Sequence, residues 1–133
     1  LKECARVLKP GGRMVVIDVV APEEQVLDTA LQVIEFLRDG SHVRNYRLSE
    51  WAGMFRVAGF ETRPADSWKL ALEFPSWVAR IGTSAARIAA LEAVFAGLSD
   101  EARRYLQVST ELSFAIEAAW MEATAAVGRP AGV

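Results

Sequence analysis

The chain has 133 residues, of which 52% are hydrophobic and 9% aromatic; this suits one domain with a packed core and excludes a disordered chain. Charged residues make up 24% of the sequence and are scattered, with a formal net charge of -2. The sequence therefore offers no electrostatic basis for binding nucleic acid or an anionic membrane.

The cysteine count and the hydropathy pattern limit the disulfides, metal sites and membrane spans that the chain could contain. A single cysteine, Cys4, excludes an internal disulfide, and with the single histidine, His42, it excludes a zinc site built from cysteines and histidines. No apolar run approaches the roughly 18 residues of a membrane span, and the first residues do not have a signal-peptide pattern. We expect a cytoplasmic protein in which Cys4 is a small core residue.

The chain is organised around a strand predicted over 13–20. Apolar residues at helical spacing predict a short helix over 1–8, which Pro10 and the pair Gly11-Gly12 end. The β-branched run that follows is typical of a strand buried on both faces of a parallel sheet. Because such a strand needs neighbours that eight residues cannot supply, we expect the chain to begin in the middle of a larger domain.

A helix is predicted to begin at Pro22 and to end before Gly40. Glu23 and Glu24 suit its first turn and Arg38 its last, because the helix dipole favours these charges there. Its buried stripe is expected to consist of Val26, Ala30, Val33, Ile34 and Leu37.

The polar segment 39–47 contains the histidine and is predicted to be a loop between two helices. The second helix is expected to have Ser49 as its N-cap and to end at Gly59. Loops held between rigid helices often carry binding groups. The apolar face of the second helix is predicted to contain Trp51, Met54, Phe55 and Ala58.

Alternating apolar residues then predict a half-buried strand over 60–74, whose early part Pro64 pushes toward an edge or bulge. A short helical turn is expected after Pro75, a further helix around Leu91, and another that begins at Ser99.

The end of the chain is ambiguous in local pattern. Over 112–127, the content of Ala and Glu favours a helix, whereas the alternation of large residues permits a strand. We expect the domain to span 1–127 and to be followed by a flexible tail over 128–133.

One sequence motif resembles that of a known family. The sequence RVLKPGGR of residues 6–13, followed by a hydrophobic strand and Asp18, resembles the late motif of class I S-adenosylmethionine-dependent methyltransferases. Within this superfamily it is most similar to the small-molecule enzymes of the ubiquinone and menaquinone biosynthesis type. The words from His42 to Phe60 and the later Phe-Pro-Ser-Trp resemble the same group, so the resemblance covers nearly the whole chain.

The resemblance implies an α/β fold that is the C-terminal half of a Rossmann-like class I methyltransferase domain, truncated at its start. In that family a seven-stranded sheet has the order 3-2-1-4-5-7-6, and its last strand is antiparallel. Residues 13–20 then correspond to the fifth strand, 60–74 to the sixth and 113–125 to the seventh, which lies between them. The resemblance thus favours a strand over 113–125 against local helix propensity.

The same resemblance implies a parent enzyme that uses S-adenosylmethionine to methylate a small molecule (EC 2.1.1.-). The glycine-rich loop and the acidic residue with which this family holds the cofactor would precede Leu1. Gly11-Gly12 lies before a strand, which is the wrong side for cradling a nucleotide. We expect this chain alone to bind no cofactor and to be inactive, while it contributes the acceptor-side half of the site.

Six residues are candidates for contacting the methyl acceptor. His42 is the candidate catalytic base, because its ordinary pKa lies near neutrality. The candidates for binding the substrate are Arg44, Tyr46, Asp18, Trp51 and Trp68. Each has a structural alternative: a loop histidine can be structural, an aspartate at a strand end can cap the next loop, and tryptophans can belong to the core.

A second class of function is a non-catalytic interaction domain that retains half of the fold. Without a fourth strand, the outer edge of 13–20 would expose unpaired backbone groups, and such an edge pairs readily with another chain. We therefore expect the isolated chain to form a homodimer around a two-fold axis. The expected partners are a small-molecule methyl acceptor and a second copy, with no nucleic acid and no membrane.

Overall fold

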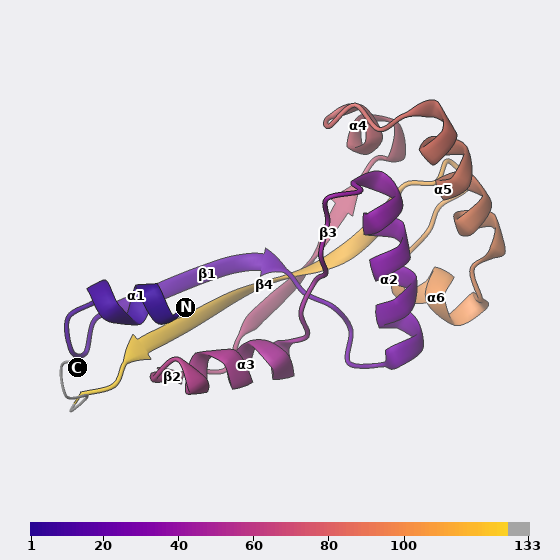
Figure 1. Ribbon diagram of the computed structural model, residues 1–133. Helices are drawn as coiled ribbons and strands as arrows, with labels where there is room; N and C mark the ends of the chain where they lie inside the picture. The colour runs from indigo at the N-terminus through magenta and orange to yellow at the C-terminus, as the bar shows by residue number, and fades with distance from the viewer. Residues whose placement is uncertain (128–133) are drawn as a thin grey trace.

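One long strand organises the computed structural model, which describes residues 1–127 (Figure 1). Strand β4, Phe114–Ala125, pairs antiparallel with β1, Arg13–Val19, along one edge. Along its other edge it pairs antiparallel with β2, Phe60–Thr62, and with β3, Asp66–Leu72. Every pair of strands in the described sheet therefore includes β4.

The position of β4 confirms the predicted insertion of the last strand between those over 13–20 and 60–74. Its alternate side chains face two different cores, with Phe114 and Ile116 in one and Ala119 and Met121 in the other. This two-sided burial, with hydrogen-bonded neighbours on both edges, outweighs the helix propensity of the segment. The tail predicted over 128–133 lies outside the described residues.

The strand predicted over 60–74 is wrong in its limits. Residues 63–65 separate β2 from β3, because Pro64 has no N–H with which to continue a ladder. Phe74 belongs to helix α4, Phe74–Ala79, in which Pro75 occupies the first turn.

Two helices, α1 (Lys2–Val7) and α3 (Leu48–Val57), cover one face of the sheet. Cys4 packs against the core beneath them, as expected of a small core residue. We call this the α1/α3 core; its buried members are Val20, Phe55, Ala58, Phe60, Ala119, Met121, Ala123 and Ala125.

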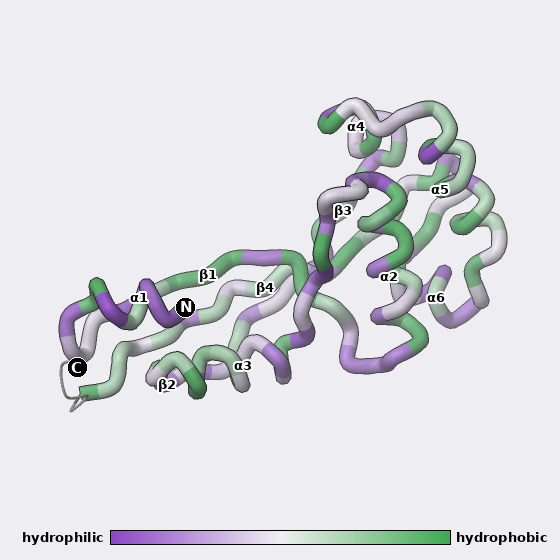
Figure 2. The backbone as a smooth tube through the Cα atoms, viewed as in Figure 1, coloured by the Kyte–Doolittle hydropathy of each residue, from purple (hydrophilic) through white to green (hydrophobic). Residues whose placement is uncertain are grey.

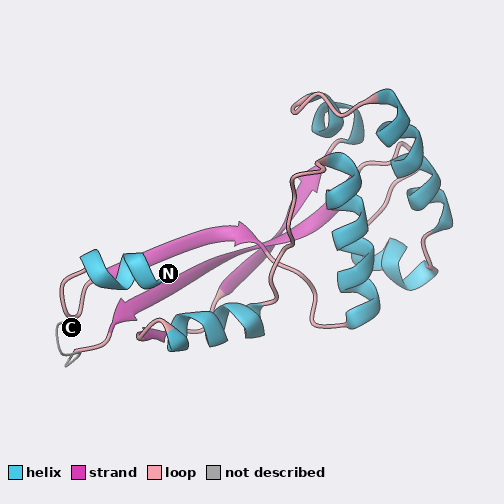
Figure 3. Ribbon diagram, in the orientation of Figure 1, coloured by secondary structure: helices cyan, strands magenta, loops and turns pink. Residues whose placement is uncertain are grey.

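Four helices gather at the other end of β4 (Figure 3). Because residues alternate along a strand, their core lies on the opposite face of β4 from the α1/α3 core. We call it the aromatic core, since the rings of Trp77 and Phe95 lie 5.0 and 5.1 Å from that of Phe114. The helices are α2 (Gln25–Arg38), α4, α5 (Ala85–Gly97) and α6 (Asp100–Tyr105).

Strand β1 is not buried on both faces, contrary to prediction. The chain is coloured as hydrophobic over most of β1 (Figure 2), yet Val15 is 41% and Ile17 56% exposed. No described element covers this part of the face, although Val19, further along the same face, packs against the aromatic core. Trp120, which pairs with Ile17, is 43% exposed. We call this apolar surface the open face; its members are Val15, Ile17, Trp68, Leu70 and Trp120.

Helix α2 begins at Gln25, later than predicted, and its buried stripe is rotated from the predicted one. Val26 and Val33, which the pattern placed in the core, are exposed. The prediction fails because two carboxylates lie on the inner face, where a rule based on apolar spacing does not place them. The buried residues are Leu27, Asp28, Leu31, Ile34 and Glu35.

Helix α3 starts differently from the prediction but ends as expected. The N-cap is Arg47, whose backbone N–H donates to the Glu50 carboxylate at 2.9 Å. The predicted cap, Ser49, lies two residues after Arg47, at the second position of the helix, and its hydroxyl donates to Glu23 at 2.8 Å. Gly59 follows the helix with a φ of +85°, a conformation that glycine adopts without strain.

Two glycines near α3 are expected to respond to alanine in opposite directions. Gly59→Ala should lower the free energy of unfolding by about 1 kcal/mol, because a Cβ strains the left-handed conformation. Gly53→Ala should raise it by about 0.5–1 kcal/mol, because Gly53 lies within the helix and an added Cβ meets only open space. Urea unfolding followed by tryptophan fluorescence measures both; changes of the same sign would contradict the assigned backbone conformations.

Candidate functional site

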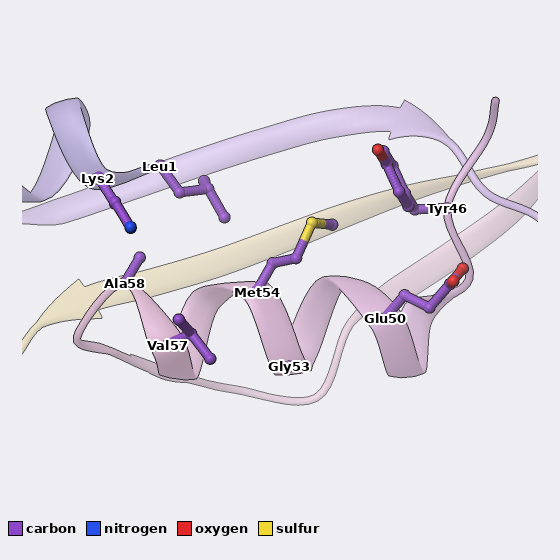
Figure 4. Close-up of a pocket in the computed structure, with 8 residues that line it drawn as sticks. All are labelled: Leu1, Lys2, Tyr46, Glu50, Gly53, Met54, Val57 and Ala58. Carbon is purple, nitrogen blue, oxygen red and sulfur yellow. The ribbon is translucent and has the colours of Figure 1, made fainter. Parts of the chain in front are cut away.

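A largely apolar cavity of about 600 Å³ lies between α1 and α3 (Figure 4). Leu1 and Lys2 point into it from the start of α1, and Met54 points back from α3. The Tyr46 hydroxyl and the Glu50 carboxylate are polar groups at the end of the cavity where α3 begins. An apolar lining with a few polar groups suits a small molecule. The lining residues are Leu1, Lys2, Tyr46, Glu50, Gly53, Met54, Val57 and Ala58.

Tyr46 reaches the cavity from a loop that two elements hold. Its carbonyl accepts a hydrogen bond from the Ala21 N–H just beyond β1, at 3.0 Å. One residue earlier, the side-chain amide of Gln32 on α2 pairs with the backbone of Asn45, donating to its carbonyl at 2.8 Å and accepting from its N–H at 2.9 Å. Segment 39–47 is thus a loop, as predicted, but its second half is anchored to β1 and α2.

A buried carboxylate fixes the arginines of this loop. Asp28 on α2 is 6% exposed and accepts hydrogen bonds from Arg47 at 2.7 and 3.0 Å, from Arg44 at 3.2 Å and from Gln32 at 2.8 Å. Burial alone would raise the pKa of Asp28, but these hydrogen bonds and the two guanidinium charges outweigh it and lower the pKa. Asp28 therefore stays ionised and ties the loop to α2.

Arg44 bridges this network to the cavity. Its guanidinium donates to Asp28 and, at 3.3 Å, to Glu50, and it lies 5.5 Å from the centroid of the Tyr46 ring. Arg44 and Tyr46, both candidates for binding the substrate, therefore lie against each other. Arg44 already has two carboxylate partners, so it acts here first as a positioning group for Tyr46 and Glu50.

His42 lies apart from the cavity, and it is absent from the residues that line it. Its Nε2 atom is buried and has no hydrogen-bond partner within residues 1–127. The nearby charged groups are on or just after the last turns of α2: Glu35, Arg38 and Asp39. Glu35 is only 8% exposed, and burial raises its pKa against the opposing charges of Arg38 and His42.

We expect Glu35→Gln to raise the melting temperature near pH 8 and to have little effect near pH 4. Burial raises the pKa of Glu35 in the folded state, so folding favours the protonated carboxyl. The free energy of unfolding is therefore highest below the pKa of Glu35 in the unfolded chain, roughly 4, and it falls as the pH rises through the pKa of Glu35 in the folded protein. Thermal unfolding across this range, with the exposed Glu92→Gln as control, measures the effect; a constant difference at all pH values would contradict it.

The other predicted site residues fall in separate places. Trp51 contacts Tyr46, with ring centroids 6.0 Å apart, and its buried Nε1 has no partner among the described residues. Asp18 is exposed at the end of β1, where its carboxylate accepts a hydrogen bond from the Val19 N–H at 2.9 Å. Trp68 belongs to the open face. The structure therefore groups Arg44, Tyr46 and Trp51 but leaves the remaining three candidates outside that group.

Sequence reasoning missed the polar residues that build the site. Asp28 and Gln32 are spaced by one helical turn on α2, and together they hold the loop. Two polar residues at this spacing within an otherwise apolar stripe are the sequence signal that indicates a polar contact on the inner face of α2. Glu50 lies in the first turn of α3, and its contact with Arg44 depends on the loop conformation, which no sequence pattern specifies.

The glycine turn of residues 11–12 does not fit a nucleotide, and the described side chains do not form a metal site. Within residues 1–127, no group of three His, Cys, Asp or Glu side chains could hold a metal. The N–H of Gly11 donates to the Ala125 carbonyl at 2.9 Å and that of Gly12 to the Lys9 carbonyl at 2.8 Å, so this turn has no free N–H for a cofactor. No helix in this part of the chain has the length and apolar character of a membrane span.

Solved structures place the chain in a structural class. The crystal structure of YcgJ from Bacillus subtilis covers 96% of this chain with a TM-score of 0.89 and 35% identity, and the match takes up 56% of YcgJ. A provisionally assigned methyltransferase from Bacillus halodurans C-125 covers 95% of the chain with a TM-score of 0.90 and 28% identity, over 61% of its own length. The chain therefore has a fold found in methyltransferase structures.

One of two curated relatives is named as a methyltransferase. The chain is 41% identical to YcgJ, an uncharacterized methyltransferase of Bacillus subtilis strain 168, over 77% of this chain and 41% of YcgJ. It is 42% identical to the uncharacterized protein YafE of Escherichia coli K12, over 84% of this chain and 54% of YafE. No protein-family model matches the chain. The chain spans about half the length of these relatives.

Proposed function

We propose that the chain forms the acceptor-side part of an S-adenosylmethionine-dependent methyltransferase that acts on a small molecule. The observation that carries this proposal is the TM-score of 0.89 to YcgJ over nearly the whole chain. The motif of residues 6–13 supports the narrower assignment to the ubiquinone and menaquinone biosynthesis type and to the C-terminal half of the domain. The cofactor supplies an activated methyl group and is held by residues other than those described.

In this proposal the α1/α3 cavity receives the acceptor. Its apolar walls suit an apolar part of the acceptor, and the Tyr46 hydroxyl can donate to or accept from a hydroxyl of the acceptor. Arg44 and Trp51 both contact the Tyr46 ring. His42, whose buried Nε2 has no partner among residues 1–127, lies outside the cavity together with Asp18 and Trp68; these three remain candidates only for an acceptor that extends beyond the cavity. We propose a cytoplasmic setting.

Calorimetric titration with S-adenosylhomocysteine tests whether this chain binds the cofactor without the rest of the enzyme. The 133-residue chain should give no heat at millimolar ligand, because its glycine turn is already hydrogen-bonded. Binding in the micromolar range would overturn the acceptor-side assignment. YcgJ, measured in the same buffer, is the comparison.

A hybrid protein tests the methyltransferase assignment itself. Joining this chain to the part of YcgJ that lies outside the match should give a folded protein that binds S-adenosylhomocysteine with an affinity close to that of YcgJ. A hybrid that folds by circular dichroism but does not bind, where YcgJ does, would contradict the proposal.

The second candidate function is a non-catalytic interaction domain that forms a homodimer through the outer edge of β1. The observation that favours it is that β1 pairs with β4 alone among the described strands, beside the apolar open face. Light scattering at high micromolar concentration should give twice the chain mass of 14.6 kDa. A monomer under these conditions would count against this candidate.

A further inference from the structure

A second cavity, of about 570 Å³, lies where β3 leads into α4 and where β4 begins (Figure 1). It shares no lining residue with the α1/α3 cavity. Its lining residues all fall within 71–115, on β3, α4, the start of β4 and the loop before it. The cavity is therefore built by one continuous part of the chain and does not involve the outer edge of β1.

Two small side chains form the floor of this cavity. Ala71 on β3 and Ala115 on β4 are paired in the sheet, so their methyl groups project from the same face. The next residues along each strand toward the cavity, Leu72 and Phe114, are buried in the aromatic core on the opposite face. The floor is thus roomy, and the packed core behind it fixes its position.

A tightly hydrogen-bonded loop forms one wall. The Ser109 N–H donates to the Ser113 carbonyl at 2.8 Å, and the Ser113 N–H donates to the Ser109 hydroxyl at 3.1 Å. These bonds hold Leu112 at a φ of +60°, near Gln107 at +51°, and such strained residues are concentrated at functional sites. The Gln107 amide and the Ser113 hydroxyl line the cavity and have no hydrogen-bond partner among residues 1–127, so both are available to a ligand.

The opposite wall presents one negative and one positive charge. Glu73 and Arg80 are the N-cap and the C-cap of α4, about 10 Å apart along the helix axis. Within residues 1–127 neither side chain forms an ion pair or a hydrogen bond. Lys69, two residues before the floor, is occupied: its ammonium donates to the Tyr105 carbonyl at 3.0 Å and lies 3.6 Å from the centroid of the Tyr105 ring. Glu73 and Arg80 are therefore the free charges of the cavity.

We propose that this cavity binds a small zwitterion whose ammonium and carboxylate groups are separated by several bonds. The Arg80 guanidinium can donate two parallel hydrogen bonds to the carboxylate, and the Glu73 carboxylate accepts from the ammonium. The alanine floor suits the methylene groups between them. A volume of about 570 Å³ is in the range of small-molecule sites. This site is additional to the acceptor cavity and goes beyond the proposed methyl transfer.

Four related small molecules test the charge pattern by calorimetric titration into the 133-residue chain. The probe is 5-aminopentanoate, which carries its two charges at opposite ends. Norvaline is its isomer with adjacent charges, pentanoate lacks the ammonium, and butylamine lacks the carboxylate. We expect 5-aminopentanoate to bind about tenfold or more tightly than each of the other three, because each of them leaves a charge of the cavity without its partner. No binding of 5-aminopentanoate at millimolar concentration, or binding no tighter than that of norvaline, would overturn the proposal.

Two substitutions locate the binding on the protein. Arg80→Ala should remove the advantage of 5-aminopentanoate over butylamine, and Glu73→Gln should remove its advantage over pentanoate. The matched controls are Arg104→Ala and Glu101→Gln, which change exposed charges on α6 outside the cavity and should leave the affinity unchanged. Circular dichroism checks that all four variants fold. Binding of 5-aminopentanoate that survives both cavity substitutions would place it elsewhere and overturn the proposal, and no arm of the test depends on cofactor binding.

Discussion

Asp28→Ala is expected to lower the free energy of unfolding by about 3 kcal/mol, equivalent to roughly 10 °C in melting temperature. The substitution leaves Arg44 and Arg47 close together without the carboxylate that they share, and Gln32 loses one acceptor. Removing one member of a buried charged network costs more than the network itself contributes, because the remaining charges stay desolvated.

Urea unfolding at pH 7 measures this effect, with Asp66→Ala on the exposed edge of the sheet as the control. The control should change the free energy by less than about 0.5 kcal/mol. The Asp28 effect should also shrink in acid: because the pKa of Asp28 is lowered in the folded state, its stabilising contribution is present above the unfolded pKa and is lost as pH falls through the folded value. Equal effects of the two substitutions would contradict the role assigned to Asp28.

Phe95→Ala is expected to have the largest effect of any substitution considered, about 4 kcal/mol. Phe95 is fully buried, and its ring lies 5.7 Å from that of Phe74 and 5.1 Å from that of Phe114. Truncation removes the contact that joins α5 to the end of β4 and leaves a cavity among rings too large to close over it.

Phe36→Ala is the matched control, because Phe36 on α2 is 51% exposed beneath the Arg87 guanidinium. It should cost less than about 1 kcal/mol. Guanidinium chloride unfolding followed by circular dichroism would compare the pair. Similar midpoints for the two variants would mean that the aromatic core contributes far less than its burial implies.

Elements with strong local signals were predicted well from the sequence. The helix over 85–97, the Ser99 cap with its hydroxyl accepting from the Ala102 N–H, and the glycine that ends α3 depend on residues close in sequence. The last strand was predicted only through the family resemblance. Its side-chain pattern is compatible with a helix or a strand. Pairing with β1, roughly a hundred residues earlier in the chain, stabilises the strand.

Two of the failed predictions share one cause, which is that local pattern does not contain tertiary contacts. The stripe of α2 was misplaced because Asp28 is buried by arginines from a later loop. The two-sided burial of β1 was inferred from composition, whereas Val15 and Ile17 have no cover in the described chain. The site was predicted in part: Arg44, Tyr46 and Trp51 meet, because the loop and helix that carry them are adjacent in sequence.

The central position of β4 has a consequence for biosynthesis. Every described strand pair requires residues 114–125, so none of these pairs can form until β4 has left the ribosome. At roughly 5–20 residues per second, the β1–β4 pair forms no earlier than about 5–20 s after β1 is synthesised. Refolding of the described sheet should likewise be slow, because the contacts that β1 makes with β4 are distant in sequence.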